Sequence, residues 1–114
     1  MRKEIKDYWL VALKAGTHKQ GKLLLKTTED HYCFMGVLAD LSVIYAGVVR
    51  TQDKVSYMYD GFRECLPTKT VEWAGMKNPH GFSAQLGTSL LALNDKGVPW
   101  EEITKVLEKN WENL

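Results

Sequence analysis

The segment YCFMGVLADLSVIYAGV, from Tyr32 to Val48, carries the clearest helical pattern in the chain. Its apolar residues keep helical spacing, and Asp40 and Ser42 are the only polar interruptions. A helix that is apolar over most of its circumference is typical of a buried element. We therefore expect a central, buried helix here. Glycine inside a helix costs about 1 kcal/mol relative to alanine, so at Gly36 we expect close approach by another backbone or a ligand.

A second helix is predicted over residues 3–15, before this segment. Its apolar residues fall on one face, and Gly16 is suited to end it in a left-handed conformation; the face comprises Ile5, Tyr8, Trp9, Ala12 and Leu13.

Three further helices are predicted after the central segment. A short one covers residues 66–75, from the turn at Pro67 to Gly75. The C-terminal third reads as a helical hairpin whose first helix is capped by Thr88 or Ser89 and closed by Gly97. The last helix starts at Pro99, with an apolar face formed by Trp100, Ile103, Leu107 and Trp111 and a favourable i,i+4 pair between Glu101 and Lys105.

Two segments have the composition of strands. Residues 23–28 (LLLKTT) follow a polar turn at 19–22 and precede a turn at 29–31. Residues 49–62 are predicted to form a β-hairpin or a loop excursion, because apolar and polar residues alternate there and Asp60-Gly61 is a turn signal. We therefore predict one domain over residues 1–114 of the α+β class. It is mainly helical, with a small antiparallel sheet packed on the central helix.

Composition limits the classes of function. The 114 residues are the size of one domain, and 15 basic against 14 acidic residues give a net charge of +1. This balance provides no general attraction to nucleic acid or to an anionic membrane, so we expect neither partner. The N-terminus, MRKEIKDYWL, lacks the apolar stretch of a signal peptide, and two cysteines are too few for a disulfide framework or a structural zinc site. We expect a cytoplasmic protein.

No metal or cofactor site is predicted. The three histidines, His18, His31 and His80, fall in separate predicted turns without the spacing of a metal-binding motif. Cys33, near the start of the central helix, could be a nucleophile, because a helix N-terminus lowers the pKa of a thiol. The general base would then be His80 or His18, since His31 is too close in sequence. The alternative is a small buried thiol that only packs.

Polar and aromatic residues around the central helix make a candidate ligand-binding site, because such pockets combine aromatic walls with a few placed polar groups. The candidates are Trp9, Lys19, Gln20, Tyr32, Cys33, Asp40, Asn78, Asn94 and Asp95, with Trp73 as a further aromatic wall. The alternative for Asn94 and Asp95 is capping and turn formation between the last two helices.

Several motifs together resemble an uncharacterised group of small proteins that is common in bacteriophage and prophage genomes. The matching positions are Trp9, Ala12, Leu13, Gly16, Gln20, Gly21, Tyr32, Cys33, Gly36, Val37, Leu38, Asp40, Leu41, Leu66, Pro67, Trp73, Ala74, Gly75, Asn78, Pro79, Leu93, Asn94, Asp95, Gly97, Glu102 and Ile103. The chain departs from the pattern at Phe34 and Ala39, where that group often has cysteines, and at Met76 and Trp100.

This resemblance implies a phage origin but no established activity. Phage accessory proteins of this size often inhibit or sequester components of host defence. The expected function is therefore non-enzymatic binding, either of a small nucleotide-like signal or of a host protein. A small hydrolase that uses Cys33 and a virion-associated structural protein are the alternatives. Four tryptophans and five tyrosines could also form an aromatic interface, so a homo-oligomer is a further expectation.

Overall fold

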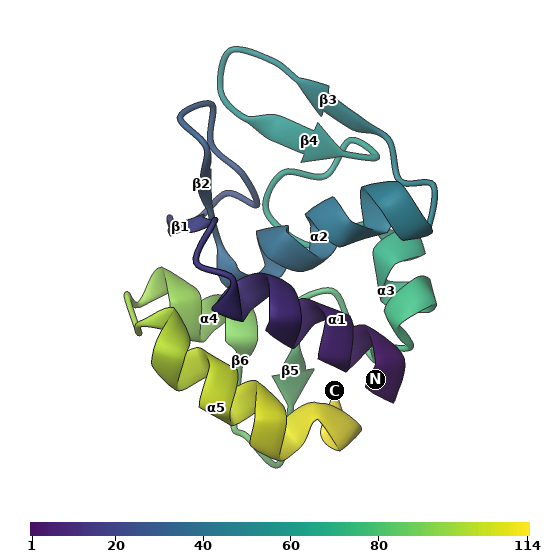
Figure 1. The fold of residues 1–114 in the computed structure, drawn as a ribbon, viewed down its shortest axis with the longest axis vertical. Helices are drawn as coiled ribbons and strands as arrows, with labels where there is room; N and C mark the ends of the chain where they lie inside the picture. The colour runs from purple at the N-terminus through teal and green to yellow at the C-terminus, as the bar shows by residue number, and fades with distance from the viewer.

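Five helices and three short two-stranded sheets make up the computed structural model, which describes residues 1–114 (Figure 1). In Figure 1, α1 lies between α2 and α5, the β3–β4 hairpin is at one end of the molecule, and β5–β6 is near the other. The helices are α1 (Lys3–Lys14), α2 (Phe34–Tyr45), α3 (Thr68–Ala74), α4 (Leu90–Asp95) and α5 (Trp100–Asn110), followed by a 3-10 turn, η1 (Trp111–Asn113). The strands are β1 (Lys19–Gln20), β2 (His31–Tyr32), β3 (Arg50–Gln52), β4 (Tyr57–Tyr59), β5 (Phe82–Ser83) and β6 (Thr88–Ser89). The α+β class is confirmed.

The α2 helix is buried in its first half and exposed at its end. Every residue from 34 to 39 is buried, whereas Ile44 and Tyr45 are largely exposed. The prediction of a helix buried over its full length is therefore not confirmed. The close approach predicted at Gly36 does occur: a Cβ atom there would lie 1.8 Å from the backbone oxygen of Leu25. Only glycine lets the 25–26 segment cross the helix at this distance.

The α1 helix forms as predicted, and its inward face buries Ile5, Trp9 and Leu13. Gly16 adopts a left-handed conformation (φ 73°) just past the helix end. Tyr8 differs from the expectation, because 51% of its surface stays exposed. The apolar side of α1 is thus wider than the part of the helix that is buried in the core.

The strand predicted over residues 23–28 is wrong. Leu23 has a left-handed backbone (φ 70°), and only Lys26 and Thr27 make isolated bridges. Tertiary hydrogen bonds hold this segment in an irregular path: the N–H of Leu23 donates to the Asp95 carboxylate, and the N–H of Leu25 donates to the carbonyl of Arg63. β1, which lies in the predicted turn at 19–22, pairs in parallel with β2, which joins His31 of the other predicted turn to Tyr32 of the predicted central helix.

The β3–β4 hairpin confirms the prediction for residues 49–62, with Arg50 opposite Tyr59 and Gln52 opposite Tyr57. Its connection lies at residues 53–56, and Asp60-Gly61 forms the next turn, after β4. The single small sheet expected from the sequence is therefore three separate pairs, of which β3–β4 and β5–β6 are antiparallel.

The remaining helices begin and end close to their predicted positions. Gly75 ends α3 with a left-handed conformation, and the side chain of Ser89 caps α4 by accepting a hydrogen bond from the N–H of Ala92. Pro99 precedes α5 directly, and Gly97 has φ 87° in the short connection before it. One cluster of 20 buried hydrophobic residues, from Ile5 to Leu114, connects the helices into one core.

Candidate functional site

Asn94, at the end of α4, is the centre of a buried hydrogen-bond network. Its Oδ1 accepts from the backbone N–H of Phe34 at 3.0 Å and from the indole Nε1–H of Trp100 at 2.8 Å. Its Nδ2 donates to the carbonyl of Gly21 at 2.8 Å. The amide of Gln20 also reaches Oδ1, at 3.3 Å, and makes a shorter bond of 2.8 Å to the carbonyl of Val98.

This network brings together three of the regions predicted to form a site: Gln20, Asn94 and the start of α2. The first N–H groups of a helix have no partner within the helix. Cys33 occupies the N-cap position of α2 without a capping side-chain bond, and Asn94 supplies the missing acceptor from α4. Because Asn94 is fully buried and its polar atoms are used, it is a structural residue that also fixes the orientation of Trp100.

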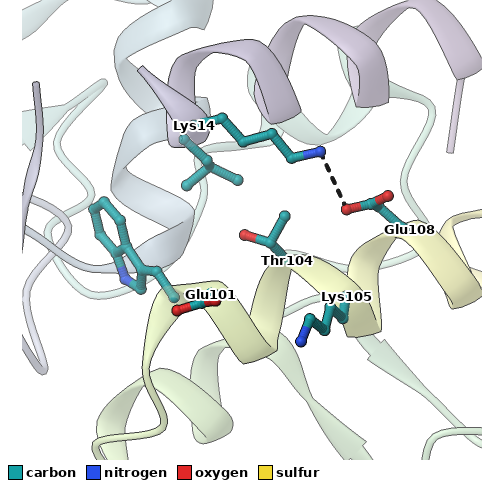
Figure 2. Close-up of a pocket in the computed structure, with 7 residues that line it drawn as sticks. Lys14, Glu101, Thr104, Lys105 and Glu108 are labelled. Carbon is teal, nitrogen blue, oxygen red and sulfur yellow. Dashed lines mark ion pairs between the residues drawn. The ribbon is translucent and has the colours of Figure 1, made fainter. Parts of the chain in front are cut away.

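Trp100 lines a cleft of about 420 Å³ between α1 and α5 (Figure 2). The other lining residues are Leu13, Lys14, Glu101, Thr104, Lys105 and Glu108. Figure 2 shows Lys14 reaching from α1 toward Glu108 of α5, and the two charged groups form an ion pair at 3.3 Å across the cleft. The volume lies within the range of small-molecule sites, about 300–1,000 Å³.

The lining of the α1/α5 cleft combines an aromatic wall with charges of both signs. Trp100 has a fixed ring, because its N–H is held by Asn94. Two lysines and two glutamates line the same cleft, and the ion pair on this part of α5 joins Glu108 to Lys14 instead of the predicted Glu101 to Lys105. Such a lining can stack a planar ring and hold a charged group beside it.

Sequence reasoning did not find this cleft. The sequence pattern predicts Trp100 on the apolar face of the last helix and indicates no functional role for Lys14, Thr104 or Glu108. A signal was nevertheless present, since Thr104 is a polar residue within the buried side of α5. What the sequence could not indicate is that α1, some ninety residues earlier in the chain, lies alongside this part of α5.

Asp95 lies in a different pocket from the α1/α5 cleft, with a volume of about 340 Å³. It shares this pocket with Glu64, Cys65, His80 and two leucines, Leu23 and Leu91. A cysteine and a histidine thus line one pocket, but burial and the neighbouring Glu64 raise the pKa of the Cys65 thiol. A raised pKa opposes formation of a nucleophilic thiolate.

Cys33 is fully buried, and burial raises the pKa of its thiol to about 12. Neither histidine considered as its base forms a hydrogen bond with the thiol: His18 packs edge-on against Tyr32, and His80 lies in the pocket with Asp95. The packing interpretation of Cys33 therefore fits the structure, and the nucleophile interpretation does not.

Tyr32 and Asp40 belong to a second polar network, between α2 and the β3–β4 hairpin. The Asp40 carboxylate pairs with Arg50 at 2.7 Å and accepts from the hydroxyl of Tyr59 at 2.8 Å. The hydroxyl of Tyr32 is 3.5 Å from the other oxygen. Burial and the Asp40 charge raise the pKa of Tyr59. This network ties the hairpin to α2, and its groups are engaged with one another.

The remaining candidates lie apart from one another. Trp9 is buried and donates from Nε1 to the carbonyl of Phe34, and Lys19 is exposed on β1. Asn78 organises its own loop by accepting from the N–H groups of His80 and Phe82. Of the nine predicted residues, the structure thus joins Gln20 to Asn94 and Tyr32 to Asp40 by hydrogen bonds, and it places Asp95 in a separate pocket.

No group of three or more His, Cys, Asp and Glu side chains is arranged to hold a metal ion. The longest helices, α1 and α2, have 12 residues each, and none could cross a bilayer.

A model of one protein family matches residues 1–111, and that family is described as a domain of unknown function, DUF8296. No curated protein and no solved structure matches the chain.

Proposed function

We propose that this chain, which belongs to the DUF8296 family, is a phage-encoded binding protein that sequesters a small nucleotide-like ligand as a counter-defence measure. The phage setting rests on the motif resemblance described above. The binding role rests on one observation, the fixed indole of Trp100 in the α1/α5 cleft. Capture of a ligand requires no reactive group, only a surface that is complementary to it.

A nucleotide needs a flat apolar surface for its base and a cation near its phosphate. Stacking of a base on an aromatic side chain is worth about 1–3 kcal/mol. The ring of Trp100 provides the surface, and the ammonium groups of Lys14 and Lys105 are the cations of the cleft. Because Asn94 holds the indole in the unliganded protein, little rotamer entropy is lost when a ligand stacks on it.

The pocket that contains Asp95 suits such a ligand less well. Its charged groups include the two carboxylates of Glu64 and Asp95, and no lysine or arginine lines it. These carboxylates repel a phosphate. We therefore assign the ligand to the α1/α5 cleft and give Asn94 the role of positioning Trp100.

The hydrolase alternative has less support. It requires an accessible thiolate, whereas the Cys33 thiol is buried with a raised pKa. A counter-defence binding protein can also block a host protein. That role would use an exposed surface instead of the α1/α5 cleft.

The test is calorimetric titration of cyclic nucleotides and ADP-ribose derivatives into the wild-type protein and three charge variants. Lys14→Gln should weaken binding about two- to fivefold, because an exposed charge contributes up to about 1 kcal/mol. Glu108→Gln should strengthen binding, since it removes the carboxylate that now neutralises Lys14. Lys54→Gln, in the exposed β3–β4 connection, is the matched control and should change nothing.

A fourth variant, Trp100→Leu, tests the stacking surface and should weaken binding at least about tenfold. Circular dichroism must confirm that it folds. If no compound in the panel binds the wild-type protein, the ligand proposal fails. If compounds bind but Lys14→Gln and Glu108→Gln change affinity in the same direction, the assignment to this cleft fails.

A further inference from the structure

Thr104 is the one buried polar residue among those that line the α1/α5 cleft. Only 7% of its surface is exposed, and Figure 2 shows its side chain directed from α5 toward α1. A threonine within a helix commonly donates from Oγ1 to a carbonyl three or four residues earlier. The Thr104 hydroxyl makes no hydrogen bond to any group of the chain. Because no fully enclosed side-chain oxygen or nitrogen lacks a partner, this hydroxyl is open to the cleft.

Glu101 lies three residues before Thr104, on the same side of α5. Residues with this spacing are neighbours on a helix surface, with Cβ atoms about 5–6 Å apart. The Glu101 carboxylate is exposed and forms no ion pair, whereas the other glutamate of the cleft, Glu108, pairs with Lys14. An ionised carboxylate only accepts hydrogen bonds, on two oxygens, and a hydroxyl both donates and accepts. The cleft thus presents a hydroxyl and two acceptor oxygens one helical turn apart.

The Watson–Crick edge of guanine is complementary to this set of groups. It carries one acceptor, O6, followed by two adjacent donors, N1–H and the amino group N2–H. The hydroxyl of Thr104 can donate to O6, and the two oxygens of Glu101 can accept from N1–H and N2–H. No other common base places two donors side by side. Adenine and cytosine each have an amino group next to a ring-nitrogen acceptor, and in uracil a single N–H lies between two carbonyl oxygens.

We propose that the α1/α5 cleft selects guanine nucleotides, with Thr104 and Glu101 reading the base that stacks on Trp100. This inference rests on the proposed function, because it specifies the base of the ligand assigned to that cleft. Trp100 directly precedes Glu101 and lies four residues before Thr104, so all three residues belong to the first turns of α5. Lys105, the next residue, forms no ion pair and provides a cation for phosphate. The groups that recognise the nucleotide therefore come from one helix and are held in place before the ligand binds.

Calorimetric titration of the full chain with the 5′-monophosphates of guanosine, inosine and adenosine (GMP, IMP and AMP) tests the base selectivity. GMP should bind at least about tenfold more tightly than AMP, because the carboxylate of Glu101 accepts two hydrogen bonds from guanine and one from adenine. IMP keeps O6 and N1–H but lacks the amino group, so its affinity should fall between the two. IMP that binds as tightly as GMP would overturn the bond from the amino group to Glu101.

The Glu101→Gln variant tests which residue selects the base. It should bring the affinities for GMP and AMP within about threefold of each other, because an amide has one acceptor oxygen and sets its own N–H donors against those of guanine. Glu72→Gln is the matched control: Glu72 is an exposed glutamate of α3, and this variant should keep the wild-type ratio. A Glu101→Gln variant that keeps a tenfold preference for GMP would overturn the role of Glu101.

The Thr104→Val variant removes the hydroxyl at nearly constant shape. It should weaken GMP binding about three- to tenfold, and Thr104→Ser, which keeps the hydroxyl, should bind GMP within about twofold of the wild type. The melting temperature of unliganded Thr104→Val should equal or exceed that of the wild type, because no hydrogen bond within the chain is lost. A lower melting temperature with unchanged GMP affinity would show that the hydroxyl serves the fold and would overturn its role in the cleft.

The outcomes separate this inference from the proposed function. If GMP and AMP bind with equal affinity, or if AMP binds more tightly, the selection of guanine fails and the nucleotide site stands. If none of the three nucleotides binds, the selection of guanine also fails. The proposed function then fails with it only if the cyclic nucleotides and ADP-ribose derivatives do not bind either.

Discussion

Replacing Asn94 with alanine should destabilise the protein far more than loss of a helix cap would. The substitution removes the hydrogen bonds to the N–H of Phe34, the indole N–H of Trp100 and the carbonyl of Gly21. Phe34 is fully buried, so its N–H cannot bond to water, and an unpaired buried donor costs about 1–3 kcal/mol. Trp100 and Gly21 are partly exposed, and each of their bonds is worth about 0.5–1.5 kcal/mol.

The expected loss in the free energy of unfolding is therefore about 2–6 kcal/mol, against about 0.5–2 kcal/mol for an ordinary N-cap. For a chain of this size a loss of about 4 kcal/mol lowers Tm by about 15 °C. Because this is a large part of the stability of a typical domain, the variant should be compared with the wild type by urea denaturation at low temperature.

Asn110→Ala is the matched control for this measurement. Asn110 is also a helical asparagine, but its side chain makes a single bond, from Nδ2 to the carbonyl of Val106 at 2.9 Å. Its loss should cost about 0.5–1.5 kcal/mol. If Asn94→Ala costs no more than Asn110→Ala, the network around Asn94 is not what holds α2, α4 and the 20–21 segment together.

Three other perturbations test the core. Gly36→Ala should lower the free energy of unfolding, measured by urea denaturation, by at least about 3 kcal/mol, because the new Cβ would collide with the backbone of Leu25, which cannot move aside like a side chain. In the control Gly47→Ala the new Cβ meets no neighbour, so the loss should be only about 1–2 kcal/mol, from the left-handed backbone. Equal losses would contradict the argument. In the folded protein a thiol reagent should modify Cys65, which is partly exposed, and should leave Cys33 unmodified until the chain unfolds. Rapid modification of both cysteines would support the hydrolase interpretation. Stability should also fall at alkaline pH, because the unfolded Cys33 thiol ionises near its ordinary pKa of about 8.5 whereas the folded thiol keeps its proton until about pH 12. The stabilisation is complete below the pKa of the unfolded thiol and decreases by up to about 1.4 kcal/mol per pH unit above that pKa. The unfolding free energy of the wild type should therefore fall by about 2–3 kcal/mol relative to that of Cys33→Ala between pH 7.5 and 10.5. A constant difference between the two proteins would show that Cys33 is not buried as described.

Features that depend only on neighbouring residues can be predicted from the amino-acid sequence. The periodicity of residues 3–15 predicts α1 and its buried face of Ile5, Trp9 and Leu13, because side chains three and four residues apart share one side of a helix. Gly75 and Ser89 mark helix ends for equally local reasons, a left-handed backbone and a side-chain oxygen close to the first turn.

Features that join residues far apart in the chain follow from the tertiary packing and not from local sequence. Nothing local to Cys33 indicates that the acceptor for the first turn of α2 comes from Asn94, sixty residues later, and nothing local to Leu23 indicates that hydrogen bonds from distant segments keep it out of a strand. The α1/α5 cleft depends in the same way on how α1 packs against α5. Periodicity indicates which face of a helix is buried, but hydrophobic burial is not directional, so it does not specify which distant segment will cover that face.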